Sequence, residues 1–416
     1  MYSILVFLFG TFFLIARRIR LGRYRNTLLH RCGFFNLKAE EGARVIWIHA
    51  VSLGETKAIA PLYQKLRLEN PDAYIVISNA TETGQQEAQK SLKGADLIFY
   101  LPLDAAWIMR KLVRDLHPDL LIFVETDFWY NLIHYTRKRG GKVLLVNGKM
   151  SERSFCRWMK VPFLARRFFG MFDYLCVQNE EYRSRFEQLG ISPQRLSITG
   201  NLKCDIEFAK KDPEKLQKML RAGDFVILLA STHDPEEKLL LKALRGLQIP
   251  NLKILLAPRH PERFPVVADL LTAEKIPFLL FSKETEEAAN VILIDAMGTL
   301  GICYQLSHFS LVCGSFIPGI GGHNLLEPLF LGSPVIFGPY TENQTEFAAR
   351  ILEAQAGYSV SIEQLPALVT ELLVDPRKRQ ELTDRGADLI EQMRGATERT
   401  LVHVRKMVPE KNRIGV

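Results

Sequence analysis

The sequence predicts an α/β protein made of two doubly wound domains, with one further helix ahead of them. Short apolar runs that fit buried parallel strands alternate with amphipathic segments, and this alternation occurs in two series along the chain. A polar stretch at residues 201–212 separates the two series. The chain has 416 residues and 47% hydrophobic content, which is enough for two separate cores.

The first predicted element is a membrane anchor at residues 1–22. Residues 2–16 are almost wholly apolar, and the basic residues that follow, with no acid before position 40, are Arg17, Arg18, Arg20, Arg23, Arg25, Arg31 and Lys38. These seven charges account for all but one of the formal net charge of +8. Because the basic residues are confined to this segment, they indicate a collar of positive charge that faces the lipid headgroups, and not a nucleic-acid partner.

The mode of membrane attachment stays open at this stage. Fifteen helical residues cover about 22 Å at ~1.5 Å each, less than a hydrocarbon core of about 30 Å, so a spanning and a partly inserted helix both fit. The positive-inside rule predicts that both domains lie on the cytoplasmic side, and the membrane is expected to be the inner (cytoplasmic) one. The alternative is an apolar helix packed on the protein core.

The remaining elements follow in order. The first domain, at residues 40–205, has strands predicted at residues 45–49, 74–78, 97–101, 120–124, 143–146, 174–177 and 196–199. The second domain, at residues 213–395, has strands predicted at residues 225–230, 253–257, 278–281, 291–294, 309–313 and 335–337. Residues 396–416 are expected to form a C-terminal helix and tail. The six cysteines form no CxxC pair, which favours reduced thiols.

A glycine-rich loop at residues 314–334 lies between the last two predicted strands. Its glycines allow positive φ angles, and a helix that starts near Asn324 would offer free N–H groups to a phosphate or carboxylate. Glu327, one turn into that helix, would hold sugar hydroxyl groups; the alternative is a solvated first-turn acid. Asn324 stands where the dinucleotide fingerprint needs its third glycine, and no Walker A lysine follows.

A second candidate site follows the first strand of the first domain. Gly54 permits a turn, and Glu55 stands at the start of the next helix. A carboxylate there, facing a cleft between the domains, would accept a proton from an attacking hydroxyl group as a general base. Ser52 and Glu55 also fit an ordinary capping box, and both interpretations stay open.

Several separated motifs together resemble one family, the transferases of 3-deoxy-D-manno-octulosonic acid (Kdo). The spacing of Glu327, Gly332 and Pro334 resembles the nucleotide-binding helix of two-domain, GT-B type glycosyltransferases. The other matching pieces stand in the family's order: Ser52-Leu-Gly-Glu55-Thr, Leu101-Pro-Leu-Asp104, Val124-Glu125-Thr126 with Trp129 and Asn131, Gln178-Asn179-Glu180, Thr199-Gly200-Asn-Leu-Lys203, Ser231-Thr-His233, Pro258-Arg-His-Pro-Glu-Arg-Phe264 and Gly321-Gly-His-Asn324.

The resemblance implies a GT-B fold with two Rossmann-like domains facing a cleft, the first for the acceptor and the second for CMP-Kdo. It implies transfer of Kdo to lipid A or its tetraacyl precursor, a step of lipopolysaccharide core biosynthesis in Gram-negative bacteria. It also implies that Glu55 is the general base and that Glu125 and Lys203 support the transition state. The residues implied to bind CMP are Pro258, Arg259, Met297, Gly298, Thr299, Asn324, Leu325, Leu326 and Glu327.

The chain departs from the family pattern in a few places, which bear on acceptor preference. Asp127 and Tyr130 replace a glutamate and a proline, Lys149 replaces an arginine, and Thr299 replaces a common glutamate. No Asp-x-Asp sequence and no metal-ligand spacing occurs, so a metal-independent mechanism without a cofactor is expected. The rival interpretations are another GT-B enzyme, such as a UDP-sugar transferase or epimerase, and a non-catalytic, membrane-tethered nucleotide-binding protein.

Overall fold

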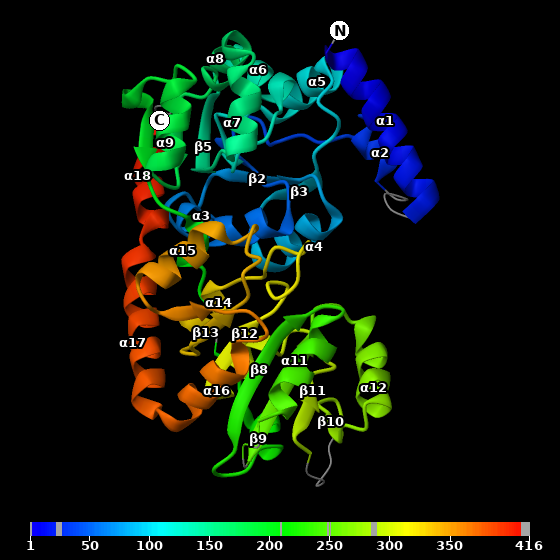
Figure 1. Ribbon diagram of the computed structural model, residues 1–416. Coiled ribbons are helices and arrows are strands. Elements are labelled where there is room, and N and C mark those ends of the chain that lie inside the picture. The colour runs from blue at the N-terminus through cyan, green and yellow to red at the C-terminus, as the bar shows by residue number, and fades with distance from the viewer. Residues whose placement is uncertain are drawn as a thin grey trace. The chain divides into compact units, whose positions relative to one another are not determined.

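The computed structural model describes residues 2–21, 27–208, 210–247, 249, 251–283 and 289–408, without the side chains of residues 17, 18, 20 and 21. Most side chains of the predicted arginine collar, those of Arg17, Arg18, Arg20, Arg23 and Arg25, lie outside this description. The chain forms two compact units, one of Met1–Ile206 with Met393–Val416 and one of Glu207–Gln392. Each unit contains its own parallel sheet (Figure 1).

The sheet of the first unit has the strand order β3-β2-β1-β4-β5-β6-β7, and all its pairings are parallel. Its strands are β1 (Val45–His49), β2 (Tyr74–Asn79), β3 (Leu97–Tyr100), β4 (Leu120–Val124), β5 (Lys142–Gly148), β6 (Tyr174–Val177) and β7 (Leu196–Ile198). Its helices are α1 (Tyr2–Leu21), α2 (Leu28–Arg31), α3 (Leu53–Glu69), α4 (Glu82–Ser91), α5 (Ala106–Leu116), α6 (Tyr130–Lys138), α7 (Glu152–Met159), α8 (Pro162–Phe169), α9 (Glu180–Gln188), and the short η1 (Pro193–Arg195) and η2 (Leu202–Asp205).

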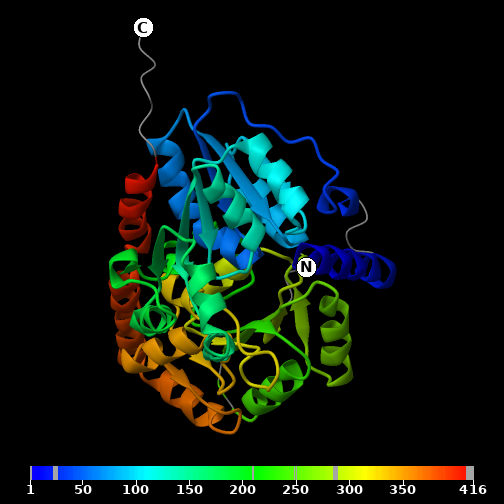
Figure 2. The same cartoon turned by 90° about the horizontal axis from the view of Figure 1, so that it is seen from above.

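Helices cover both faces of this sheet, as Figure 2 shows, and the apolar runs of β1 and β4 are therefore buried on both sides. Alternate residues point to opposite faces: Trp47 belongs to the cluster under α5, α6 and α8, whereas Ile46 and Ile48 belong to the cluster under α3, α4 and the C-terminal helix. The full burial of these strands explains why their sequence shows no polar alternation.

The strand order reverses between β1 and β4. From β1 the chain continues to β2 and β3 on one side, and then returns to β4 on the other side of β1. In a doubly wound sheet, the loops after two such strands diverge at the carboxyl edge, which is where ligands bind. The residues that follow β1 and β4 are thus candidates for a ligand-binding site.

The sheet of the second unit has the order β10-β11-β9-β8-β12-β13-β14, again with parallel pairings, and its order reverses between β8 and β12. Its strands are β8 (Phe225–Thr232), β9 (Leu252–Pro258), β10 (Phe278–Leu280), β11 (Val291–Leu293), β12 (Phe309–Val312), β13 (Val335–Phe337) and β14 (Gly357–Ser359). Its helices are α10 (Glu214–Lys218), α11 (Glu236–Arg245), α12 (Arg263–Ala273), α13 (Leu300–Leu306), α14 (Leu326–Phe330), α15 (Thr345–Glu353), α16 (Leu365–Val374) and α17 (Pro376–Met393).

The last helix, α18 (Ala396–Met407), belongs to the first unit although it follows the second in sequence. Leu401 and Val404 are buried in the cluster beneath α3. The Asp205 carboxylate accepts hydrogen bonds from the backbone N–H groups of Gly395 (2.8 Å) and Thr397 (2.5 Å), which caps the start of α18. The predicted tail at residues 409–416 lies outside the described residues.

Helix α1 packs on the first unit by one face only. Its Tyr2 hydroxyl donates to Asp104 (3.0 Å), and the rings of Phe7 and Trp107 lie 5.3 Å apart. The other face is apolar and exposed, and includes Leu8, Phe9, Phe12, Phe13 and Ile19. Within the described part of the chain, none of the helices combines the length and the apolar composition that crossing a membrane requires.

Candidate active site

In the first unit, Glu55 lies at the carboxyl edge of the sheet, directly after β1. Ser52 caps α3, and its hydroxyl donates to one carboxylate oxygen of Glu55 (2.8 Å). The backbone N–H of Val51 donates to the other carboxylate oxygen (2.7 Å), while the N–H of Glu55 donates to the Ser52 hydroxyl (3.4 Å). The Ser52 half of the predicted capping box is therefore formed, while the Glu55 carboxylate accepts from the N–H of Val51, one residue before the cap, so the arrangement is a variant of that box. It orients the carboxylate and does not by itself rule out a role in proton transfer.

The environment of Glu55 favours its protonated form. Only 8% of the residue is exposed, and this burial, together with the nearby charges of Glu125 and Asp127, raises the pKa of Glu55 from 4.5 to about 7. The hydrogen bonds from Ser52 and Val51 act in the opposite direction but are outweighed. A carboxyl group with a pKa near neutrality is suited to accept a proton at physiological pH.

Glu125 lies beside this site because it directly follows β4, the strand across the reversal from β1. Its backbone has a φ of 61°, in the left-handed region that non-glycine residues rarely adopt. One carboxylate oxygen lies 3.2 Å from the Lys203 Nζ and the other 2.5 Å from the Lys149 Nζ. Two ammonium groups are therefore held at this edge by one buried carboxylate.

These contacts come from segments far apart in the sequence. Lys203 lies on η2, whose position is fixed by Asn147: the Asn147 side chain accepts a hydrogen bond from the Leu202 N–H (3.0 Å). Burial acts to lower the pKa of Lys149, but the carboxylates of Glu125 and Glu55 outweigh it, so the pKa of Lys149 is raised. The sequence indicated Lys149 only as a departure from a family pattern, and the structure gives it a place in the cluster.

Two other residues of the matched motifs, Asp104 and Asn131, form hydrogen bonds that hold the structure together. The Asp104 carboxylate accepts from the backbone N–H groups of Asn131 (2.9 Å) and Leu132 (2.9 Å) at the start of α6, and from the Tyr2 hydroxyl of α1. The Asn131 side chain donates to the Asp104 carbonyl (2.5 Å). These motifs join α1 and α6 to the loop after β3.

In the second unit, the predicted CMP-binding segments all gather at one edge of the sheet. They follow β9, β11 and β12, and β8 lies between β9 and β12 in the sheet. Pro258 is the buried last residue of β9, and Arg259 is exposed directly after it. The Arg259 N–H donates to the Thr232 carbonyl at the end of β8 (3.1 Å), which ties the two loops together.

The other predicted segments differ in exposure. Met297 is exposed, and Gly298 has a φ of 79°. Thr299 precedes helix α13, but its side chain does not cap that helix; the hydroxyl donates instead to the Ala296 carbonyl (2.7 Å). Leu325 and Leu326 are buried, whereas Glu327 is half-buried. Helix α14 begins at Leu326, later than the predicted start near Asn324, and the Asn324 side chain accepts from the Leu326 N–H (3.0 Å).

The backbone N–H groups at the start of the glycine-rich loop already have a protein partner. Glu236, fully buried at the start of α11, accepts from the N–H groups of Gly314 (2.8 Å to each oxygen), Phe316 (3.1 Å) and His233 (3.1 Å). Burial raises the pKa of Glu236 against these hydrogen bonds. Gly314 has a φ of 72°, and a Cβ atom there would lie 2.8 Å from Ile320. Glu236 therefore holds the loop that carries Asn324 in place through its backbone hydrogen bonds.

Two histidines meet at the same edge. The Nε2 atoms of His233, after β8, and His323, in the glycine-rich loop after β12, are 2.7 Å apart, and their rings are nearly parallel. The His260 ring lies 5.5 Å from that of His233. The sequence placed His233, His260 and His323 at predicted strand ends, where they could line a site or form local hydrogen bonds. It did not predict the contact between His233 and His323 or the part of Glu236, because only the sheet brings residues so far apart in sequence together. Across the described ranges, no three His, Cys, Asp or Glu side chains cluster as a metal site would require.

Comparisons with known proteins agree with this arrangement. A family model described as "3-Deoxy-D-manno-octulosonic-acid transferase (kdotransferase)" matches residues 21–206. The 3-deoxy-D-manno-octulosonic acid transferase of Chlamydophila psittaci is 33% identical over 98% of this chain and 95% of its own. The protein of the same name from Haemophilus influenzae is 34% identical over 91% of each chain.

Solved structures support the fold. A UDP-GlcNAc 2-epimerase from Neisseria meningitidis has a TM-score of 0.61 at 15% identity, over 87% of this chain and all of that chain. A glycosyltransferase from Rickettsia africae has a TM-score of 0.58 at 13% identity, over 90% of this chain and all of that chain. These likenesses show an α/β fold with two parallel sheets, as in GT-B proteins. On the strength of its sequence relatives, the chain belongs to the 3-deoxy-D-manno-octulosonic acid transferase family.

Proposed function

We propose that this protein is a glycosyltransferase that moves Kdo from CMP-Kdo to lipid A or its tetraacyl precursor, in lipopolysaccharide core biosynthesis. Family membership supports the reaction class. The observation that carries the mechanism is Glu55, a buried carboxyl group with a pKa raised to about 7 at the reversal point of the first sheet. This position and pKa fit the general base that the transfer needs.

In the proposed reaction, a hydroxyl oxygen of the acceptor attacks the anomeric carbon of Kdo. The bond from that carbon to the phosphate oxygen breaks, and its electron pair leaves with CMP. Glu55 takes the proton of the attacking hydroxyl group, so charge and atoms balance. Val51 and Ser52 hold the carboxylate in place, and their hydrogen bonds fix its orientation before the substrate arrives.

Within each unit, charges at the edge of the sheet suit a part of the proposed reaction. In the first unit, Glu125 positions the ammonium groups of Lys149 and Lys203, which favour negative charge that develops nearby. In the second unit, the exposed guanidinium of Arg259 is suited to a phosphate, and Asn324 and Glu327 remain candidates for the nucleoside. Because these side chains supply the cations, the proposed mechanism requires no metal ion or cofactor.

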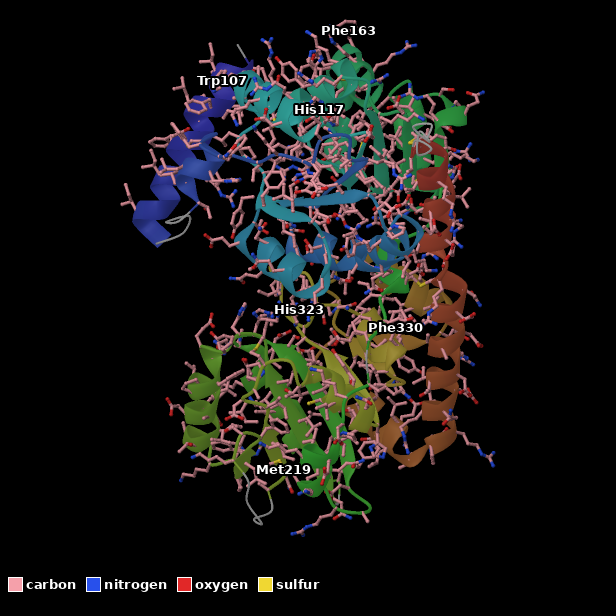
Figure 3. The ribbon with its side chains drawn as sticks, turned by 180° about the vertical axis from the view of Figure 1, so that it is seen from behind. Trp107, His117, Phe163, Met219, His323 and Phe330 are labelled. Atoms are coloured by element: carbon pink, nitrogen blue, oxygen red, sulfur yellow. The ribbon has the colours of Figure 1, made fainter. Side chains whose placement is uncertain are left out.

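We further propose that the protein works at the cytoplasmic face of the inner membrane, where a lipid acceptor is confined. The support is the exposed apolar face of α1, including Phe9 (70% exposed) and Phe12 (72% exposed). On α8 of the same unit, Phe163 is another exposed ring (74% exposed), and Figure 3 shows it at the same end of the unit as Trp107. Apolar rings of this kind insert at a membrane interface without spanning it.

Direct incubation with CMP-Kdo and a tetraacyl lipid A precursor tests the proposal. We expect CMP release together with a mass increase of the lipid by one or more Kdo units. Glu55→Gln should lower the rate by about a hundred- to ten-thousandfold, because it keeps the size of the side chain but removes its basicity. Glu69→Gln is the matched control: it lies on the same helix, pairs with Arg405 at the surface, and should leave the rate unchanged.

The same assay separates the rival interpretations. Turnover of a UDP-sugar, with none of CMP-Kdo, would replace the proposal with another GT-B activity. Binding of CMP without any transfer would support the non-catalytic nucleotide-binding protein. Near-normal transfer by Glu55→Gln would remove Glu55 as the base while leaving the reaction class intact.

A further inference from the structure

The histidine pair lies where the second sheet reverses its order. Strand β8 has β9 on one side and β12 on the other, and the chain passes from β8 to β9 but reaches β12 only after β11. His233 directly follows β8, and His323 lies in the loop that follows β12. Figure 3 shows His323 at the edge of the unit. Ligands of doubly wound sheets bind at such a point, and this one carries two imidazole rings.

The geometry of the pair restricts its protonation. An Nε2–Nε2 distance of 2.7 Å is a hydrogen bond, so one nitrogen carries the proton and the other accepts it. Two imidazolium groups would both be donors and would repel each other at this distance. Burial, followed by the charges of His233, Arg259 and His260, lowers the pKa of His323 to about 4. The unliganded pair therefore has one shared proton and no net charge at neutral pH.

The groups around the pair offer it no anion among the described residues. Burial, followed by His260, Arg259 and Arg263, lowers the pKa of His233 as well. The nearby acids have other partners. Glu236 binds backbone N–H groups, as described above. Glu237 accepts from Arg263 (3.1 Å) and from the Thr232 hydroxyl (3.0 Å), and the largely exposed Asp234 lies 3.8 Å from Arg263. The positive charges that act on the pair thus come from Arg259 and Arg263, while the neighbouring carboxylates are engaged in hydrogen bonds and ion pairs of their own.

We propose that His233 and His323 form the phosphate-binding pair of the donor site and take up one proton when the phosphate of the nucleotide arrives. This inference rests on the proposed function, since it assigns the donor phosphate to a particular pair of side chains. An anion that contacts both rings favours their charged form and so stabilises the imidazolium. Both Nε2–H groups then turn from each other to phosphate oxygens.

The pair would also respond to the reaction itself. When the bond between Kdo and phosphate breaks, the phosphate gains one negative charge, and two charged donors bind this dianion more tightly than the ground-state monoanion. The protons stay on the nitrogens, so no further acid is needed. Glu236 contributes by holding both loops: its carboxylate binds the backbone of His233 as well as that of Gly314. We therefore treat Glu236 as a positioning residue.

Titration calorimetry of the full-length protein with CMP tests the inference. Measured near neutral pH in buffers of different ionisation enthalpy, the wild type should take up close to one proton more per CMP than His323→Gln. His323→Gln and His233→Gln should each weaken CMP binding by about ten- to a hundredfold, the usual effect of losing a charged hydrogen bond. His117→Asn is the control: this exposed residue has a φ of 45°, which asparagine tolerates.

Several outcomes are decisive. Equal proton counts for CMP in the wild type and in both histidine variants would overturn the inference, even if affinity fell, because a merely structural role changes affinity and not proton uptake. Cytidine, which lacks the phosphate, should show no difference in proton count between wild type and variants, and an equal difference would also refute the phosphate assignment. Failure of the wild type to bind CMP at all would overturn the proposed donor itself, and this inference with it.

Discussion

The pKa of Glu55 gives the sharpest quantitative test of the proposed mechanism. The change from 4.5 to about 7 has burial as its largest cause, Glu125 as its second, and corresponds to about 3 kcal/mol that disfavours the charged form. Since only ionised Glu55 accepts a proton, kcat/KM should fall below neutrality and reach about a tenth of its plateau at pH 6. Glu125→Gln removes one negative charge and frees Lys149 and Lys203. The midpoint should therefore move to lower pH, yet stay above 4.5, because the burial remains.

The assay is CMP release at varied acceptor and saturating CMP-Kdo, measured from pH 5 to 9 for the wild type, Glu125→Gln and Glu69→Gln. The Glu125 variant is also expected to have a lower plateau, so the position of the acid limb is the readout and not the rate. Glu69→Gln should leave the limb in place. A wild-type midpoint below pH 5, or a limb that stays in place in Glu125→Gln, would show that the electrostatic argument for Glu55 is wrong.

The remaining predictions concern the nucleotide and the membrane. Arg259→Ala should weaken CMP binding and transfer together by about tenfold or more, because a guanidinium pairs with phosphate; unchanged affinity in calorimetry would exclude Arg259 from the site. The double variant Phe9→Ser with Phe12→Ser should bind anionic phospholipid vesicles at least tenfold more weakly without loss of thermal stability, since both rings are exposed. Phe7→Ser, on the packed face of α1, should instead lower Tm, and equal vesicle binding by all three proteins would argue against the interfacial role.

Much of the fold follows from local sequence pattern. β1, β4, β6 and β13 have the predicted bounds, because each is a short, largely apolar run; polar residues flank β4 and β6, and Pro334 and Gly338 flank β13. Among the described residues, the pattern missed strand β14, which is Gly-Tyr-Ser at the edge of the sheet, where a single residue of the strand is buried and no apolar run is required. Helix α14 begins at Leu326, two residues after Asn324, because the Asn324 side chain binds the Leu326 N–H ahead of the first helical turn.

The candidate site residues also divide into those that local motifs predict and those that only the pairing of strands brings together. Glu55, Glu125 and Lys203 were predicted through motifs, and the structure brings them to one edge, although their catalytic roles stay predictions. The carboxylate of Glu125 also holds Lys149, and this contact depends on the neighbouring ends of β4 and β5, which sequence alone does not place. The same reason applies to His233 and His323, which are joined only through the pairing of β8 with β12.

Two buried glutamates with raised pKa values stand after the first strand of their sheets, and their hydrogen bonds indicate which one transfers protons. Glu236 is fully buried and accepts backbone hydrogen bonds from three residues, so its carboxylate is committed to holding the loops after β8 and β12. Glu55 is 8% exposed and accepts one bond per oxygen, from the Val51 N–H and the Ser52 hydroxyl. Each oxygen of Glu55 keeps a lone pair for a further donor. Protonation of Glu236 would release a loop, whereas protonation of Glu55 leaves its scaffold intact. We therefore assign the base to Glu55 and the positioning of the phosphate loop to Glu236.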